Sequence, residues 1–588
     1  MNYRKVLALF LTIGMVSASL TGCGEKNNTA GNTDIAAETS EQSGTKTSEQ
    51  SSADNSGETS ESSAKLDTTD LFSDRDLDGS YDGENAIAIS LQGNSASCDS
   101  NLVKIEGSTI TINSEGVYIL KGTLENGQII VDADQSKVQL VLSGASVTCQ
   151  SSAAVYVKQA DKVFLTLDEN TENTLSTSGE FVQTDDNTVD GVVFSKDDIT
   201  VNGKGKLTVT AGNGHGIVSK DELTMTGGEI TIQASGHALS GKDSVCIADG
   251  NYQLTAGTDG IHSDNEEDTA KGFIYIGGGI FQITSASDGL DASGKIRIDH
   301  GNLTLNCDDD GIHGDTALYI ADGTIDVQKS NEGLESAMIL IDGGTIHVVS
   351  SDDGLNTSGE GGSDRNQFGF SDNQKTSISI VINGGNLTVE AEGDGLDSNG
   401  SFSMTGGTVY VYGTQNGGNG ALDFDSTGVI SGGYLAAVSC STMESSFGDS
   451  SSQGSIATAL SSTVTGELSL KDPDGNVLIS CSPNKPYSTV QISCPELAAG
   501  KTYTLTAGSQ TVEIVMDGLH YGAFSNGGGG GKNKGGMGGN MPERANKGDR
   551  KSGMPGEKNP ADGNSGSENG EQKPEPGLET AGNEMGEL

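Results

Sequence analysis

A pattern of about 22 residues recurs through the middle of the chain. One copy contains the turn S-D-G-L-D at Ser287–Asp291, and the next contains D-D-G-I-H at Asp309–His313. Between these turns lie short segments in which apolar and polar residues alternate, which is the periodicity of a β-strand. A fixed repeat with short strands, frequent glycine and no amphipathic segment of helix length is typical of a solenoid. We therefore predict an all-β fold, a parallel β-helix with about 22 residues per coil.

The turn of each repeat is built around a glycine with polar residues on both sides. In a β-helix, residues one coil apart stack directly, so each repeat position becomes a column in space. The position before the glycine, which is replaced by Ala238 in one repeat, holds His215, His237, Asp259, Asp288, Asp310, Glu332, Asp353 and Asp394. The second position after it holds Val218, Ser240, His262, Asp291, His313, Glu335, Asn356, Asp397 and Asp423. The leucine or isoleucine between them points into the core, so both columns are expected at one outer edge.

Stacked carboxylates of this kind need a compensating positive charge. Two carboxylates about 5 Å apart repel by roughly 1 kcal/mol in water and by about 3 kcal/mol at an effective dielectric constant of 20. Calcium accepts six to eight oxygen ligands in flexible geometry and combines Asp, Glu and Asn. We predict calcium sites shared between successive coils, with ligands drawn from Asp259, Asp288, Asp291, Asp310, Glu332, Glu335, Asp353, Asp394, Asp397 and Asp423.

A simpler interpretation of the acidic turns stays open. Asp-Gly pairs are good turn formers on a solvated edge, whether or not a metal is bound. Acid on both sides of the glycine, with further acids at Asp308, Asp309, Asp352 and Asp425, favours the metal site. The histidines of the two columns are expected to relieve charge crowding rather than to bind a soft metal.

The two ends of the chain differ from the repeat. Arg4 and Lys5 precede a short apolar run that ends in L-T-G-C at Leu20–Cys23, which resembles the lipobox of bacterial lipoproteins. Residues 1–23 are therefore predicted to be a lipoprotein signal, and residues 24–80 a disordered Ser/Thr/Glu-rich tether. The chain would be exported and held at the outer face of the cell membrane through lipidated Cys23. Cleavage nearby by ordinary signal peptidase is the alternative.

The remaining boundaries follow from changes in composition. Residues 81–440 are predicted to form the β-helix and residues 441–520 a small C-terminal β cap, followed by a disordered Gly-rich and acidic tail at 521–588. The formal net charge of −49 argues against nucleic acid as a partner, since phosphate binding requires a basic surface. The seven cysteines beyond Cys23 are scattered, which argues against a disulfide framework or a zinc site. A monomer is expected.

Several longer segments carry a family resemblance. They are "GQIIVDADQSKVQLVLSGASV" from Gly127, "YVKQADKVFLTLDENTENTL" from Tyr156, the D-G-(L/I)-(D/H/N) turns and "SCPELAAGKTYTLTAG" from Ser493. Over about residues 80–518 the chain resembles exported β-helix carbohydrate-binding proteins of bacteria that degrade plant polysaccharides, which are similar to calcium-dependent pectate lyases. The resemblance implies a right-handed parallel β-helix, bound calcium, and affinity for acidic polysaccharide such as polygalacturonate, or for cellulose.

The residues narrow the choice of ligand. Flat sugar faces are usually held by exposed Trp or Tyr, and the chain has no Trp. The candidate outward pair is Tyr410 and Tyr412, so crystalline cellulose is the weaker candidate. The insertion at 357–374 carries Arg365 and Phe368 beside the acidic edge, and it is expected to form either a binding lip or a disordered loop.

An enzymatic function is the main rival hypothesis. A calcium-dependent lyase needs a base beside the metal, which in the similar lyases is a lysine or arginine. Lys196, Lys220 and Lys242 follow their turns at matching positions, and Lys295 occupies a nearby one. A lysine repeated in this way is typical of a solvated row that offsets acidic residues rather than of one activated base. We therefore predict a carbohydrate-binding protein that is not an enzyme. A calcium-dependent polysaccharide lyase and a non-catalytic adhesin or structural surface protein are the alternatives.

Overall fold

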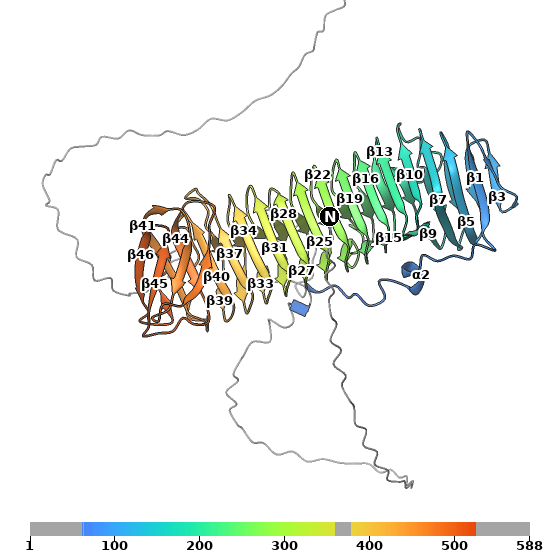
Figure 1. The fold of residues 1–588 in the computed structure, drawn as a ribbon. Coiled ribbons are helices and arrows are strands. Elements are labelled where there is room, and N and C mark those ends of the chain that lie inside the picture. The colour runs from blue at the N-terminus through green and yellow to red at the C-terminus, as the bar shows by residue number, and fades with distance from the viewer. Residues whose placement is uncertain (1–60, 63, 359–377, 525–588) are drawn as a thin grey trace, which may run out of the picture. The chain divides into compact units, whose positions relative to one another are not determined.

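The computed structural model describes residues 61–62, 64–358 and 378–524. These residues lie within one compact unit, Met1–Gly527. Their strands stack in chain order, coil upon coil (Figure 1). The predicted β-helix and its small C-terminal β cap are confirmed.

The coils are held together by three ladders of parallel strands. The first ladder contains β1 (Ile87–Gly93), β5 (Gly116–Leu124), β7 (Lys137–Cys149), β10 (Glu172–Thr177), β13 (Lys206–Ala211), β16 (Glu229–Ala234), β19 (Asn251–Ala256), β22 (Ile280–Ser285), β25 (Asn302–Cys307), β28 (Thr324–Lys329), β31 (Thr345–Ser350), β34 (Asn386–Ala391), β37 (Thr408–Tyr412) and β40 (Tyr434–Ser439). The second ladder begins on β7 and contains β9 (Lys162–Leu167), β12 (Asp198–Gly203), β15 (Glu222–Met225), β18 (Ser244–Ile247), β21 (Phe273–Ile276), β24 (Lys295–Ile298), β27 (Ala317–Ile320), β30 (Met338–Ile341), β33 (Ser379–Ile382), β36 (Ser401–Met404) and β39 (Gly428–Ile430).

The third ladder is a 14-stranded sheet made mostly of very short strands. It contains β3 (Val103–Glu106), β4 (Thr109–Ile112), β6 (Gln128–Asp132), β8 (Val155–Gln159), β11 (Gly191–Ser195), β14 (His215–Ser219), β17 (Leu239–Gly241), β20 (Ile261–Ser263), β23 (Leu290–Ala292), β26 (Ile312–Gly314), β29 (Leu334–Ser336), β32 (Leu355–Thr357), β35 (Leu396–Ser398) and β38 (Leu422–Phe424). Its pairs are parallel except at the start, where β3 and β4 form an antiparallel hairpin.

The core runs through the inside of the coils as one continuous cluster of buried side chains from Ile89 to Phe447. Equivalent residues stack from coil to coil, as Tyr252 and Phe281 do with ring centroids 4.7 Å apart. Each coil therefore buries its apolar residues against the coils on either side of it, which is why one coil could not fold alone.

The C-terminal cap covers the end of the stack. β41 (Ser455–Val464) and β44 (Tyr487–Ser493) pair antiparallel, and β44 also pairs antiparallel with the last strand of the first ladder. A 4-stranded antiparallel sheet follows, formed by β42 (Leu468–Lys471), β43 (Val477–Cys481), β45 (Thr502–Ala507) and β46 (Gln510–Val515). Two short strands, β2 (Ala96–Ser97) and β47 (His520–Tyr521), pair with β1 and β41. The cap thus occupies a strand edge that would otherwise be open to association.

The segment predicted to be a tether up to residue 80 is ordered in its last part. Residues 64–81, here called the N-terminal strap, lie along the outer side of the second ladder. Ala64 is buried against Tyr319, and the Arg297 Nη1 atom donates a hydrogen bond to the Leu66 carbonyl at 2.7 Å. The strap runs from there back toward the first coils, against the order of the chain in the stack (Figure 1).

A short helix fixes the middle of the strap. α2 (Asp74–Leu77) begins after Ser73, whose hydroxyl accepts a hydrogen bond from the Asp76 backbone N–H. The buried Asp76 carboxylate accepts a hydrogen bond from Thr200 at 2.5 Å and forms an ion pair with Lys162 at 2.9 Å. Composition alone predicts disorder here because the strap has few apolar residues, yet these polar contacts hold it in place.

Within the described residues, no helix is both long enough and apolar enough to cross a membrane.

Candidate functional site

The strand register of the third ladder brings the second predicted column into line, while Asp259, Asp288 and Asp310 of the first column are buried. Asp291 pairs with His262 on one side and His313 on the other, and the same column continues through Glu335, Asn356, Asp397 and Asp423. In most of these three-residue strands the flanking side chains are buried and the middle one is partly exposed, because side chains alternate across a strand. We call this column, together with the acids from Asp259 to Asp394 that precede the turn glycines, the acidic face.

The acids before the turn glycines also form a hydrogen-bonded series between coils. The Asp288 backbone N–H donates to Asp259 Oδ1 at 3.1 Å, and the Asp310 N–H donates to Asp288 Oδ1 at 2.7 Å. The series continues with Glu332 N–H on Asp310 Oδ1 at 3.0 Å and Asp394 N–H on Asp353 Oδ1 at 2.6 Å. Part of each carboxylate is therefore used to satisfy a backbone donor of the next coil.

This series lends weight to the structural explanation of the Asp-Gly turns. The sequence shows that carboxylates stack, but not that one oxygen of several of them accepts a backbone N–H. The second oxygen of each of these carboxyl groups takes no part in this backbone series. A role in stability and a role in binding are therefore compatible on the same side chains.

The acids of the acidic face are hard to ionise together. Burial, aided by the nearby Asp291 and Asp259 charges, raises the pKa of Asp288 to about 7. Burial and the charge of Asp288 raise the pKa of Asp310 to about 9. The same causes, burial first and neighbouring carboxylates second, raise the pKa of Glu332 to about 7, of Asp353 to about 6, of Asp394 to about 7 and of Asp397 to about 8. Near neutral pH this surface retains protons unless a cation takes their place.

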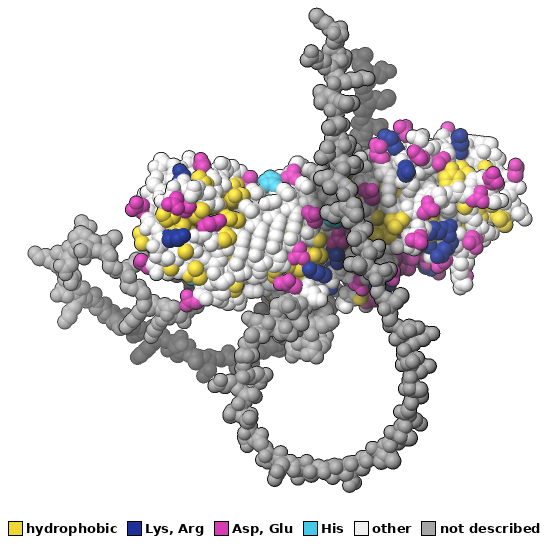
Figure 2. All heavy atoms as spheres, turned by 60° about the horizontal axis from the view of Figure 1, so that its bottom comes forward, with side chains coloured by type: hydrophobic (Ala, Val, Ile, Leu, Met, Phe, Trp, Pro, Cys, Tyr) yellow, Lys and Arg dark blue, Asp and Glu magenta, His cyan; other side chains and the backbone are white. Residues whose placement is uncertain are grey.

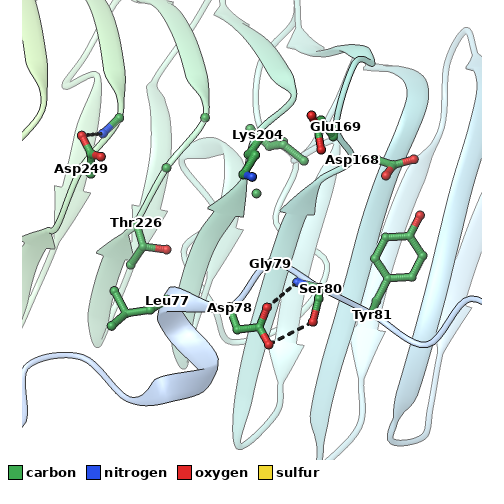
Figure 3. A pocket seen from close by; sticks show the side chains of 15 residues that line it. Leu77, Asp78, Gly79, Ser80, Tyr81, Asp168, Glu169, Lys204, Thr226 and Asp249 are labelled. Atoms are coloured by element: carbon green, nitrogen blue, oxygen red, sulfur yellow. Dashed lines mark hydrogen bonds between the residues drawn. The ribbon is translucent and has the colours of Figure 1, made fainter. Parts of the chain in front are cut away.

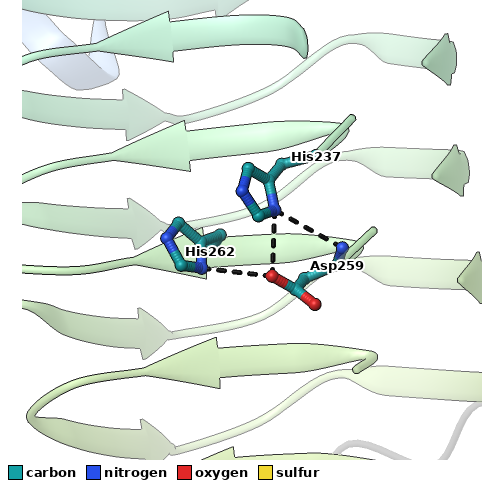
Figure 4. Close-up of side chains that lie close together, drawn as sticks. All are labelled: His237, Asp259 and His262. Atoms are coloured by element: carbon teal, nitrogen blue, oxygen red, sulfur yellow. Dashed lines mark hydrogen bonds and ion pairs between the residues drawn. The ribbon is translucent and has the colours of Figure 1, made fainter. Parts of the chain in front are cut away.

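A row of histidines continues the acidic face toward the N-terminus. His262 Nδ1 lies 2.9 Å from Asp291 Oδ2 and 3.2 Å from Asp259 Oδ2, and His237 Nδ1 lies 2.9 Å from the same Asp259 atom (Figure 4). Burial opposes charge on His262, but its hydrogen bonds to the two aspartates raise its pKa to about 9. Burial opposes the charge on Asp259 too, while hydrogen bonds from the two histidines lower its pKa. His262 thus acts as the counter-ion expected from the sequence.

The ring geometry of these histidines disfavours a shared metal. The rings of His237 and His262 are stacked, with centroids 4.0 Å apart and an angle of 7° between their planes. A metal ion lies in the plane of each imidazole that binds it, so parallel stacked rings do not converge on one ion. Although three ligand atoms of His237, Asp259 and His262 lie within 4.8 Å of one another, the group is better described as a charge-balancing cluster.

The next coils offer a donor set that fits a hard cation. Ligand atoms of Asp288, Asp309 and Asp310 lie within 4.8 Å of one another, and His313 closes similar groups with Asp288 and Asp291 and with Asp310 and Glu335. Further along the same column, the buried Asn356 Oδ1 has no hydrogen-bond partner. Carboxylate and amide oxygens are the ligands that calcium prefers, and the residues present therefore fit the group that the resemblance implies.

The described part of the chain brings the predicted ligands together unevenly. The three-atom groups contain Asp259, Asp288, Asp291, Asp310 and Glu335 but not Glu332, Asp353, Asp394, Asp397 or Asp423. These acids are still close enough that the charges of Asp353, Asp394 and Asp423 help to raise the pKa of Asp397. Asp309 joins a group although it was not among the predicted ligands. The run of three aspartates at 308–310 is the signal that could have found it.

The predicted sugar-stacking pair is not an exposed platform. Tyr412 is 8% exposed and packs in the core of the cap with Tyr410 at its edge. The prediction of an exposed pair was wrong because β44 and the cap sheet cover this end of the first ladder, and the sequence does not show that packing. Arg365, Phe368 and Cys23 lie outside the described residues.

The lysines considered as a lyase base form a row on the third ladder. Ser195, Ser219 and Gly241 are in register, so Lys196, Lys220 and Lys242 follow at equivalent places in successive coils. Lys220 pairs with Asp190 at 2.8 Å and Lys242 with Glu267 at 3.0 Å. Figure 2 likewise shows Lys and Arg side chains set among acidic ones rather than gathered into one basic surface on the face it displays.

Comparison with known proteins points to carbohydrate binding. Residues 106–356 match the family model described as carbohydrate-binding domain-containing protein. A carbohydrate-binding domain-containing protein of Acetivibrio thermocellus is 38% identical over 128 residues, which are 21% of this chain and 45% of that relative, so the chain spans less than half of the relative's length. The gadolinium-derivative structure of the polysaccharide lyase-like protein from C. thermocellum is 33% identical, covers 40% of this chain and 97% of its own, and has a TM-score of 0.39. The family resemblance is confirmed for residues 106–356.

Proposed function

We propose that this chain, whose residues 106–356 match the carbohydrate-binding domain family, binds acidic polysaccharide such as polygalacturonate through calcium held on the acidic face. The observation that carries the proposal is the set of stacked acids whose pKa values are raised to between about 6 and about 9. A surface of this kind binds a divalent cation with a gain in stability, because the cation replaces protons and removes repulsion between neighbours.

Different residues of the acidic face would bind the calcium ion and hold its ligands in position. Asp288, Asp309 and Asp310 supply oxygen ligands, and the unpaired Asn356 Oδ1 supplies another further along the column. The series of backbone hydrogen bonds fixes the carboxylates so that little ordering is needed when the cation arrives. Bound calcium would neutralise the protein carboxylates and offer its remaining coordination positions to carboxylates of the sugar.

Binding without catalysis is favoured by the lysine row. A lyase needs one activated base beside the metal. Lys220 and Lys242 each form an ion pair with a separate acid, as expected of charge compensation along a solenoid. A non-catalytic adhesin without a specific glycan is the second alternative, and it predicts no calcium-dependent affinity.

We also propose where in the cell the protein acts. The L-T-G-C sequence at Leu20–Cys23 supports lipidation of Cys23, and an exported protein on the outer face of the cell membrane would meet polysaccharide directly.

The proposal is tested by titrating polygalacturonate onto the wild type and onto a double variant of two of the named ligands, Asp309→Asn with Asp310→Asn, in calcium and then in a chelator. The wild type should bind in calcium and lose at least tenfold in affinity in chelator, and the variant should be weaker in calcium. Asp134→Asn, an exposed aspartate away from the acidic face, is the control and should behave as the wild type. Equal affinity in every arm would contradict a calcium bridge.

A further inference from the structure

A groove lies between the N-terminal strap and the turns of the neighbouring coils, away from the acidic face. It has a volume of about 670 Å³. Figure 3 shows Leu77 and Tyr81 along the strap, with Asp249, Thr226, Lys204 and Glu169 from successive coils facing them. The volume falls within the roughly 300–1,000 Å³ range of small-molecule sites.

Glycines at the turns keep the floor of this groove bare. Gly203, Gly228 and Gly250 occupy equivalent turns of successive coils and have φ values of 95°, 94° and 135°, which favour glycine over other residues. The strap crosses one of these turns at Gly79, where an added Cβ would lie 2.8 Å from the Gly203 Cα. The close crossing explains why the strap can form a wall without filling the space beside it.

The strap wall is held in one shape and presents apolar surface. The Asp78 carboxylate accepts hydrogen bonds from the Ser80 N–H and hydroxyl, both at 2.9 Å, which fixes the bend between Leu77 and Tyr81. Leu77 keeps 57% of its surface exposed, and Tyr81 is partly exposed. An aliphatic side chain and an aromatic ring along one wall suit the C–H faces of pyranose rings.

The opposite wall is polar. Asp168, Glu169 and Asp249 bring carboxylates to it, and Lys204 makes no ion pair with any residue that the structure describes. Together with Asp78, four carboxylates and one ammonium line the groove. Such a set accepts hydrogen bonds from hydroxyl groups and repels anions, so it favours an uncharged ligand over a uronate.

We infer that this groove is a second carbohydrate site, which takes a neutral oligosaccharide without a metal. The ligand would lie along the turns of successive coils, which are spaced by about 4.8 Å. That spacing is close to the repeat of a pyranose in an extended chain, so consecutive sugars would meet equivalent turns. Tyr81 and Leu77 would contact the sugar faces, and Lys204 and the carboxylates would bind the hydroxyls.

Calorimetric titration of the full chain with cellohexaose, xylohexaose, mannohexaose and hexagalacturonate tests the inference, each in calcium and in chelator. At least one neutral hexasaccharide should bind equally well in both conditions. The double variant Leu77→Ala with Tyr81→Ala should lose at least tenfold in affinity for it, and hexagalacturonate binding should not change. Val477→Ala is the matched control, since Val477 is 56% exposed and lies in the cap.

A second variant tests the groove without the risk that the strap detaches from the coils. Lys204→Ala leaves the contacts of Asp76 with Thr200 and Lys162 in place, and it should weaken neutral-sugar binding several-fold with an unchanged melting temperature. The inference is overturned if no neutral hexasaccharide binds, if the groove variants bind as the wild type does, or if binding requires calcium. The chelator arm separates this result from failure of the acidic face to bind polygalacturonate.

Discussion

Replacing Asp288 by asparagine should stabilise the protein in the absence of metal. Asparagine keeps the side-chain oxygen that accepts the Asp310 N–H, but it removes a charge whose ionisation is opposed by burial and by Asp291. The folded pKa of about 7 against 3.8 for the free group corresponds, at 1.36 kcal/mol per pH unit, to about 4 kcal/mol at most. Screening by solvent at this partly exposed edge reduces the figure, and we expect about 2 kcal/mol.

The pH dependence follows from the sign of that shift. A carboxyl group whose pKa is higher in the folded than in the unfolded state adds to the free energy of unfolding. This contribution is complete at pH values below the unfolded-state pKa, and it is lost as the pH rises through the folded-state pKa. For the six acids of the acidic face whose pKa values are raised, this stability is lost between about pH 4 and about pH 9. The metal-free wild type should therefore be less stable at pH 8 than at pH 5.

Thermal unfolding in chelator, followed by circular dichroism, measures the effect. At about 2.1 cal/mol/K per residue over roughly 440 residues, 2 kcal/mol shifts Tm by about 2 °C. Asp288→Asn should raise Tm by that amount at pH 8 and by almost nothing at pH 4, and Asp134→Asn should do neither. In saturating calcium at pH 8 the wild type should have the higher Tm, because the variant lacks one calcium ligand. A metal-free Tm that rises with pH, or a variant less stable than the wild type in chelator, would refute the reasoning.

Three further outcomes are expected. His262→Gln should lower the free energy of unfolding by about 2 kcal/mol at pH 6. Because the pKa of His262 is raised to about 9, the difference in stability from the wild type should be greatest below about pH 6.5. In denaturation curves it should vanish by pH 10. Asp76→Ala should destabilise by about 3 kcal/mol and leave Lys162 unpaired; proteolysis within the strap should become faster, and unchanged protection would contradict its role. Cys23→Ala should move the protein from the membrane fraction to the medium, and retention on membranes would disprove lipidation.

The repeat spacing was sufficient to predict which residues stack. Asp291, His313 and Glu335 share a column in the structure because a period fixed by the strands becomes a fixed position in each coil. What each carboxylate contacts was beyond prediction, since a backbone N–H of the next coil that points at Asp288 leaves no trace in the sequence. The repeat length alone decides which side chains stack in a column, whereas a hydrogen bond also depends on the local backbone and side-chain angles.

Long-range packing explains the remaining errors. Tyr412 alternates as an outward residue of its strand, but the cap folds back over it. The strap has the composition of a disordered segment, yet Asp76 finds Thr200 and Lys162 more than 80 residues away. Neither contact has a periodic signal, because each joins segments that do not belong to the same repeat.

The strap also determines how the coil stack responds to mechanical force. A pull on the chain ahead of Ala64 reaches β1 only after the contacts of the strap have been broken one after another. Its 18 residues have a fully extended length on the order of 60 Å. Force applied there would therefore break the strap contacts, and open the groove that the strap lines, before it reaches the first coil of the stack.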